Sequence, residues 1–145
     1  MSVRDSFSAS EWRTLEFAPL WAFMQVAGID RNVDQAEMAV LAKELSESLL
    51  YKDELTRGVL SSIAADFQGT LSSWRDDERK CLPGLEDAAA VLSAKAAAES
   101  AEIFKKTILA ICAAAAKASG TPGAEVSNDE AMAFAAIAVA LDVKL

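Results

Sequence analysis

One pattern of residues occurs twice in this chain and constrains most of what it can fold into. Near the N-terminus, the apolar run from Phe17 to Ala27 is followed by a polar turn, then by Val33, Asp34 and, three residues later, Glu37. An acid at a helix N-cap with Glu three positions on is a variant of the capping box, and the apolar residue before the cap packs onto the first turn. Together, the run and the box predict a helical hairpin.

The same arrangement returns near the C-terminus. A largely apolar helix beginning near Ile103 leads into a turn containing Gly and Pro, after which Val126, Ser127 and Glu130 repeat the spacing. One hairpin cannot bury its apolar face alone, so two similar hairpins in 145 residues predict a duplicated unit. We therefore expect an all-α, compact bundle of about seven helices with an internal pseudo-two-fold duplication of helical hairpins.

The composition favours helix throughout a single domain. Hydrophobic residues make up 52% of the chain, and Gly and Pro are scarce. Ala is abundant and runs of β-branched residues are absent, so local preference points to helix. Because a chain of this length can bury a core without disulfides or metals, residues 1–145 are expected to form one domain.

Local signals predict where the helices begin and end. Ser8 and Glu11 form another capping box, and the short helix that they open is expected to end before Pro19. Pro19 then suits the first turn of the next helix, because its missing N–H would be unpaired there anyway. Further expected boundaries are helix ends at Gly28 and Gly69 and helix starts at Lys52 or Asp53, Thr70, Leu85 and Ser100.

Packing can also be predicted from the pattern of side chains. Residues 131–141 are apolar nearly all round and residues 113–118 are small, so these two stretches are expected to form the central helix pair. The charged run at residues 74–80 is expected to be a solvated face, and Cys112 a small core residue. Four large rings are expected to form a lid over the core: Trp12, Phe17, Trp21 and Phe23.

Several function classes are disfavoured by what the sequence lacks. There is no His, which removes the usual general base and the commonest zinc ligand, so we expect no enzymatic activity. A formal charge of -8 argues against nucleic acid as a partner and against direct attraction to anionic lipid.

The N-terminal segment and the apolar stretches bear on where the protein works. Residues 1–10 are polar and contain no apolar core of the kind that an export signal needs. The longest uncharged stretches fall short of the roughly 18 to 20 residues of a membrane span. A cytoplasmic location without a direct membrane span is expected. An Ala-rich helix face suits a homodimer as well as a core, and the sequence leaves both open.

The hairpin motif resembles the tellurite-resistance TerB-like domain, where it commonly reads A-x-A-D-G-x-[I/V]-[S/D]-x-x-E and occurs twice. The matching residues are Asp30, Val33, Asp34 and Glu37 in the first copy and Val126, Ser127 and Glu130 in the second. Arg31 replaces the usual Gly, and the second turn is longer and lacks a clear equivalent of Asp30. The resemblance implies a non-catalytic binding or scaffold domain in stress or tellurite resistance, with protein partners that include membrane-associated metal-resistance components.

The resemblance further implies that a divalent metal ion is held between the two halves. The candidate ligands are Asp30, Asp34, Glu37 and Glu130. Oxygen ligands favour Ca²⁺, Mg²⁺ or Mn²⁺ over Zn²⁺. An EF-hand is excluded, because Gln35 and Leu41 stand where the calcium loop needs Gly and Glu.

The same acids also have a complete structural explanation. Asp34 and Ser127 cap helices, Glu37 and Glu130 close their capping boxes, and negative charge is favourable at a helix N-terminus. Under this interpretation no metal binds. The alternative function is then a helical protein–protein interaction domain, of the adaptor kind attached to co-chaperones, whose partner docks on an apolar groove.

Overall fold

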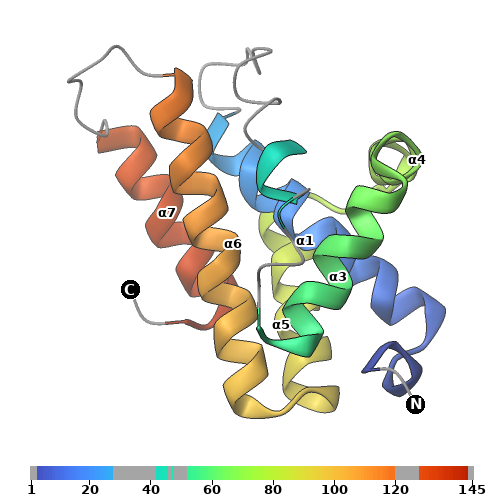
Figure 1. The fold of residues 1–145 in the computed structure, drawn as a ribbon. Coiled ribbons are helices and arrows are strands. Elements are labelled where there is room, and N and C mark those ends of the chain that lie inside the picture. Colours follow the sequence, from blue (N-terminus) through green and yellow to red (C-terminus); the bar gives the residue numbers. More distant parts are fainter. Residues whose placement is uncertain (1–2, 28–41, 46, 48–51, 120–127, 144–145) are drawn as a thin grey trace.

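The computed structural model describes residues 3–27, 42–45, 47, 52–119 and 128–143, and every regular element within them is helical (Figure 1). The elements are η1 (Val3–Ser6), α1 (Ala9–Ala27), α3 (Glu54–Ala65), α4 (Phe67–Asp76), α5 (Cys81–Lys95), α6 (Ala98–Ser119) and α7 (Asn128–Leu141). Residues 42–45 are also helical. The predicted all-α bundle of about seven helices is confirmed for these residues. The duplication is not established, since most of the second helix of the first hairpin lies outside the described residues.

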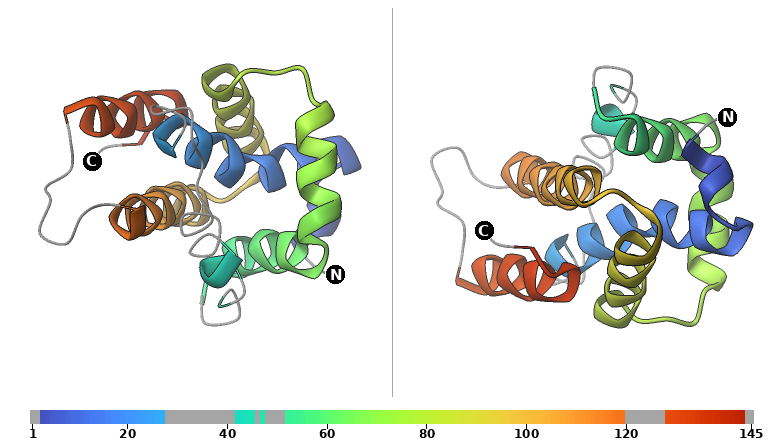
Figure 2. Two further views of the ribbon diagram at one scale, coloured as in Figure 1. Left: turned by 90° about the horizontal axis from the view of Figure 1, so that it is seen from above. Right: turned by 90° about the horizontal axis from the view of Figure 1, so that it is seen from below.

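Helix α1 is the centre of the bundle. It packs against α3, α4, α5, α6 and α7, and in both views of Figure 2 it runs between α5 and α6. Its large rings are buried: Trp12, Phe17, Trp21 and Phe23 are at most 3% exposed. The prediction that these rings form a lid is wrong, because they lie on the helix that the others surround. The predicted central pair is wrong for the same reason, and α7 lies at one end of the bundle (Figure 2).

Helix α1 begins where the sequence predicts and continues past the predicted break. The Ser8 N–H donates to Glu11 Oε1 at 2.8 Å and the Glu11 N–H donates to Ser8 Oγ at 3.1 Å, so the capping box is confirmed. Pro19 lies inside the helix rather than at a boundary. An internal proline costs about 3 kcal/mol because it removes a backbone hydrogen bond and crowds the preceding turn. The buried side chains on both sides of Pro19 offset this cost.

The boundary between α3 and α4 falls earlier than Gly69. Asp53 caps α3, as predicted, and its carboxylate accepts from the Thr56 N–H at 2.9 Å. Asp66 then caps α4 by accepting from the Gly69 N–H at 3.1 Å, so Gly69 lies in the first turn of α4. The prediction that a helix ends at Gly69 is wrong, because Asp66 accepts a hydrogen bond from the Gly69 N–H and so caps a new helix.

Helix α5 begins at Cys81, four residues before the predicted start at Leu85. Pro83 is accommodated in the first turn, where its missing N–H costs no hydrogen bond. Gly84 is buried against Trp21: a Cβ built at Gly84 would lie 2.5 Å from the indole ring. The Leu-Pro-Gly sequence therefore brings α5 close to α1 and does not interrupt the helix.

Helix α6 begins at Ala98 and not at a cap provided by Ser100. The Ser100 hydroxyl instead donates to Asp53 Oδ1 at 2.6 Å, which ties the start of α6 to the start of α3. Burial raises the pKa of Asp53, but hydrogen bonds from Ser100 and Thr56 and the charge of Arg57 together hold it below its usual value. The carboxylate is thus a polar link between two helices.

Candidate functional site

The predicted metal ligands lie largely beyond what the structure describes. Asp30, Asp34 and Glu37 are outside the described residues. Glu130 lies in the first turn of α7, and its side chain is also outside them. Helix α7 begins at Asn128, directly after the predicted cap Ser127. Within the described residues, no group of three or more potential ligands gathers, and the metal site stays a prediction.

The two helices that precede the predicted turns do lie together. Helices α1 and α6 pack against each other, as expected if the turns that follow them are neighbours. The turns themselves lie outside the described residues, and their placement stays a prediction.

The outer side of α7 is the clearest exposed apolar surface of the described residues. Met132 and Val139 are 70% and 81% exposed, although Ile137 and Leu141 on the inner side are fully buried. Met132, Ala135, Ala136 and Val139 follow the i, i+3, i+4, i+7 spacing of one helix face, and we call them the α7 outer stripe. Residues 131–141 contain no charged or polar side chain. Helix α7 is therefore apolar on its covered side and on its uncovered side.

A groove runs beside the α7 outer stripe. It has a volume of about 670 Å³ and lies between the first two turns of α5 and the middle of α7. Its lining residues are Leu82, Glu86, Ala135, Ala136, Val139 and Ala140, and we call it the α5–α7 groove. Small alanine side chains form most of its α7 wall, so a helix packed there can approach closely.

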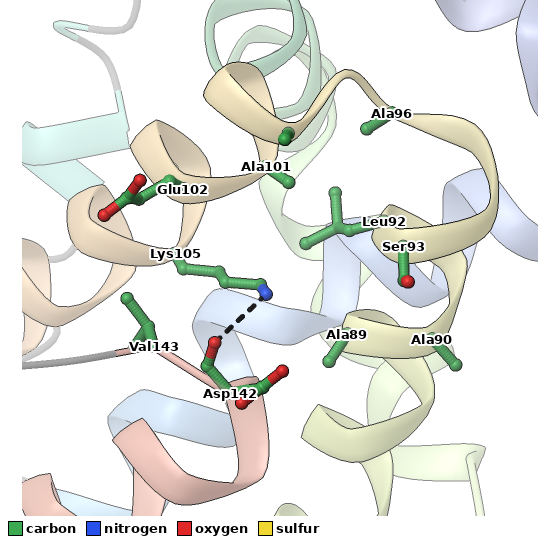
Figure 3. A pocket seen from close by; sticks show the side chains of 11 residues that line it. Ala89, Ala90, Leu92, Ser93, Ala96, Ala101, Glu102, Lys105, Asp142 and Val143 are labelled. Carbon is green, nitrogen blue, oxygen red and sulfur yellow. Dashed lines mark hydrogen bonds between the residues drawn. The ribbon is translucent and has the colours of Figure 1, made fainter.

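A second hollow, of about 600 Å³, lies farther along the same side of α5 (Figure 3). Ala89 and Leu92 of α5 face Ala101 and Lys105 of α6 across it. We call it the alanine pocket, since five of its eleven lining residues are alanines from α5, α6 and the connection between them. Its volume is within the range of small-molecule sites.

The charged groups of the alanine pocket already have structural partners. The Lys105 Nζ donates to the Asp142 carbonyl oxygen at 3.5 Å, at the C-terminal end of α7, where a positive charge is favourable (Figure 3). Glu102 forms an ion pair with Lys106 at 3.0 Å. These contacts do not select a particular ligand chemistry for the pocket.

Asp142 ends α7 in a well-defined way. Its φ of 58° lies in the left-handed region, the Asp142 N–H donates to the Val139 carbonyl and the Val143 N–H donates to the Ala138 carbonyl. This pair of bonds is the Schellman motif, which usually has Gly at the left-handed position. The motif fixes where α7 stops and so fixes the far end of the α5–α7 groove.

A third hollow, of about 310 Å³, is polar and lies among η1, α1, α3 and α4. The Trp12 Nε1 donates to Ser62 Oγ at 3.4 Å, and the Ser62 hydroxyl donates to Glu16 Oε2 at 2.8 Å. This chain of hydrogen bonds joins α1 to α3. Glu16 therefore has a structural role.

The charged run at residues 74–80 is more than a solvated face, which corrects the sequence interpretation. Arg79 pairs with Asp77 at 2.9 Å and with Asp87 at 3.2 Å, and its guanidinium lies 4.8 Å from the Trp21 ring centroid. The hydrogen bond from Arg79 holds the pKa of Asp77 below its usual value. Arg79 thus covers the central tryptophan from outside. Nothing in this run of mixed charges distinguishes Arg79 from its neighbours in the sequence.

Cys112 behaves as the sequence predicts. Its side chain is 1% exposed, and burial raises the pKa of its thiol to about 12. The thiol therefore stays protonated and unreactive at neutral pH. Cys112 is a core residue.

Comparisons with protein-family models, with curated proteins and with solved structures find no match to this chain. The resemblance to the TerB-like family therefore stays a prediction from the motif. None of the helices in the described residues is long and apolar enough to cross a membrane. The candidate functional surface is the α7 outer stripe together with the α5–α7 groove. The sequence already showed that this helix is apolar all round, and what it did not show was that one side is left uncovered.

Proposed function

We propose that this protein is a non-catalytic helical binding module that holds a partner protein against the α7 outer stripe. The observation that carries the proposal is the exposure of Met132 and Val139, two turns apart on one face of the uncharged part of α7, residues 131–141. A helix that is apolar all round is normally covered on every side. A partner bound to this face would cover the apolar side chains that the chain itself leaves exposed.

The energetic gain from such a contact is appreciable. Full burial of a Met or Val side chain contributes about 1.5–3 kcal/mol relative to exposure. The small residues Ala135 and Ala136 between the two larger ones allow a close approach. This role corresponds to the adaptor-type interaction domain that the sequence leaves as its alternative. A role in tellurite resistance or the stress response is part of this proposal only because the motif resembles that of the TerB-like family.

The proposal can be tested by photo-crosslinking in the cells that make the protein. A photoreactive amino acid replaces Val139 on the α7 outer stripe, and in a matched control it replaces Ala110, which is exposed on α6. We expect a protein adduct of defined mass from position 139 and none from position 110. Equal labelling at both positions, or no adduct at position 139, would contradict the proposal.

A second candidate function is divalent metal binding, which the paired capping boxes favour. The start of α7 directly after Ser127 agrees with the second box and puts Glu130 in its first turn. Ligand at 100 times its dissociation constant adds about 2.7 kcal/mol to the free energy of unfolding. For a domain of this size, that corresponds to a rise in melting temperature of roughly 5 to 10 degrees.

The metal hypothesis is tested by thermal unfolding after chelation, followed by Ca²⁺, Mg²⁺, Mn²⁺ or Zn²⁺ added singly. A rise that occurs in the wild type and is lost in a Glu37→Gln, Glu130→Gln double variant supports a metal site. Absence of a rise with every ion leaves these acids as helix caps. Binding at the α7 outer stripe is independent of either result.

A further inference from the structure

The α5–α7 groove and the alanine pocket are arranged along one helix. Leu82 and Glu86 of α5 line the groove, and Ala89, Ala90 and Ser93 on the next turns line the pocket. Opposite α5, Val139 and Ala140 of α7 line the groove, and farther along, Asp142 and Val143 line the pocket together with the start of α6. The two hollows therefore follow each other along the same seam. From Leu82 to Ser93 the seam extends for about 16 Å, or three helical turns.

From this arrangement we propose, on the basis of the proposed function, that the partner binds as an amphipathic helix of about three turns with a basic residue on its flank. The helix lies along the α5–α7 seam, its apolar face covers Val139 and Leu82, and its Lys or Arg pairs with Glu86. Apolar ridges of a helix fit the groove between two other helices, and helix-in-groove binding is a common form of peptide recognition.

The charges along the seam select the basic flank. Glu86 is exposed and makes no hydrogen bond or ion pair within the part of the chain that the structure describes. The cation at the far end, Lys105, already contacts the Asp142 carbonyl, and Glu102 is paired with Lys106. A formal charge of -8 on the whole chain adds long-range attraction for a basic segment.

A second copy of this chain fits the seam less well. In a symmetric dimer the same patch meets itself, so two Glu86 carboxylates would enter one interface. An anionic membrane is disfavoured too, since residues 131–141 contain no Lys or Arg.

The test uses a displayed library of 18-residue amphipathic helices. The contact face is randomised among Ala, Val, Leu and Met, and one flank position is randomised between Lys and Glu. Selections are run on the wild-type protein, on Glu86→Gln, on Val139→Gln and on Ile103→Gln, an exposed apolar position on α6 that serves as the matched control. Affinities of selected peptides are measured by fluorescence anisotropy at low and high salt.

We expect Lys-flank helices to be enriched on the wild type and on Ile103→Gln. Their affinity for the wild type should exceed that of the matched Glu-flank helices by about fivefold, as one exposed ion pair allows. The preference should disappear on Glu86→Gln and weaken at high salt, and binding should be lost on Val139→Gln.

Each other result contradicts a specific part of the inference. Binding that requires Val139 but shows no Lys preference overturns the basic-helix partner and retains the interaction surface. A concentration-dependent dimer lost in Val139→Gln, seen by analytical ultracentrifugation, also overturns it. Absence of any Val139-dependent helix overturns the inference, and if crosslinking at position 139 fails as well, the proposed function falls with it.

Discussion

Helices α1 and α7 are both long, apolar and free of charge over most of their length, yet they end up in opposite environments. From Phe17 to Phe23, every residue of α1 is buried, including Pro19. Along α7, Ile137 is fully buried while Val139, two residues on, is 81% exposed. Apolar character alone therefore does not decide which helix a bundle is built around.

The difference lies in the size of the side chains. Helix α1 carries Trp and Phe rings, each of which buries about 150–250 Å² of surface, whereas six of the 14 residues of α7 are alanine. Hydrophobic stabilisation follows the area removed from water, so the central position goes to the helix with the largest side chains. An alanine-rich helix gains less from full coverage, and one of its sides can be left for another molecule.

Truncating a ring on α1 should have the largest effect of any change that tests this contrast. Trp21 is 1% exposed, packs edge-on against Phe17 at 5.6 Å between ring centroids and is covered by Arg79. We expect Trp21→Ala to lower the free energy of unfolding by about 3–5 kcal/mol, the usual cost of removing a buried ring. Urea unfolding of the variant and the wild type measures this loss. A loss below about 1 kcal/mol would mean that α1 is not the centre of the core.

Enlarging the residue behind the same ring should have the next largest effect. A Cβ at Gly84 would meet the Trp21 ring at 2.5 Å, and the ring is held on all sides. We expect Gly84→Ala to lower the free energy of unfolding by about 1–3 kcal/mol through overpacking. Replacing Gly by Ala inside a helix normally has the opposite effect and raises stability.

Gly69→Ala is the matched control for the glycine on α5. Its Cβ would meet the Asp66 carboxylate, which is exposed and free to rotate away, so the expected cost is about 1 kcal/mol for the lost cap. Chemical denaturation of both variants gives the comparison. If Gly84→Ala were as stable as the wild type, α5 and α1 would not be in such close contact.

The link between α3 and α6 should respond to acid. Because hydrogen bonds and a nearby arginine hold the pKa of Asp53 below its usual value, its carboxylate stabilises the fold above the unfolded pKa of about 4. This contribution is lost as pH falls through the lower pKa of the folded state.

Asp53→Asn should remove that part of the acid sensitivity. Asn caps helices as well as Asp does, so the expected cost at pH 7 is only about 1 kcal/mol, for the weakened bond to Ser100. Thermal melts from pH 7 down to about pH 2 test this, and Ser100→Ala should reproduce part of the change. An acid profile of Asp53→Asn identical to the wild type would show that the Asp53 carboxylate does not stabilise the fold in this way.

How much of this architecture could be predicted from the sequence depends on whether a signal is local. The capping box of Ser8 and Glu11, the cap Asp53 and the start of α7 after Ser127 were all predicted correctly, because a cap acts within one turn of its own residue. The buried Cys112 was also correct, since its neighbours are apolar on every side. These features need no knowledge of what the helix packs against.

The incorrect predictions share a different cause. The sequence predicts helix boundaries at Pro19, at Gly69 and directly after Gly84, yet each of these residues lies inside a helix. The Gly69 N–H donates a hydrogen bond to the Asp66 carboxylate, which caps α4. At Gly84, the Trp21 ring of α1 lies so close that there is no room for a Cβ. The seam between α5 and α7 is likewise formed by segments about 50 residues apart. Contacts between distant segments are not visible in local periodicity.

The smallest expected change in the free energy of unfolding gives the sharpest test of the contrast between α1 and α7. Met132 and Val139 are already largely exposed, so Met132→Ala and Val139→Ala should each change the free energy of unfolding by less than about 0.5 kcal/mol. Val139→Ala should also weaken binding of any helix selected on the α5–α7 groove, because the apolar contact is lost only in the complex. Urea unfolding and fluorescence anisotropy on the same preparations give both numbers. A loss of stability comparable to that of Trp21→Ala would mean that the outer side of α7 is covered within the chain itself, and that the contrast with α1 does not exist.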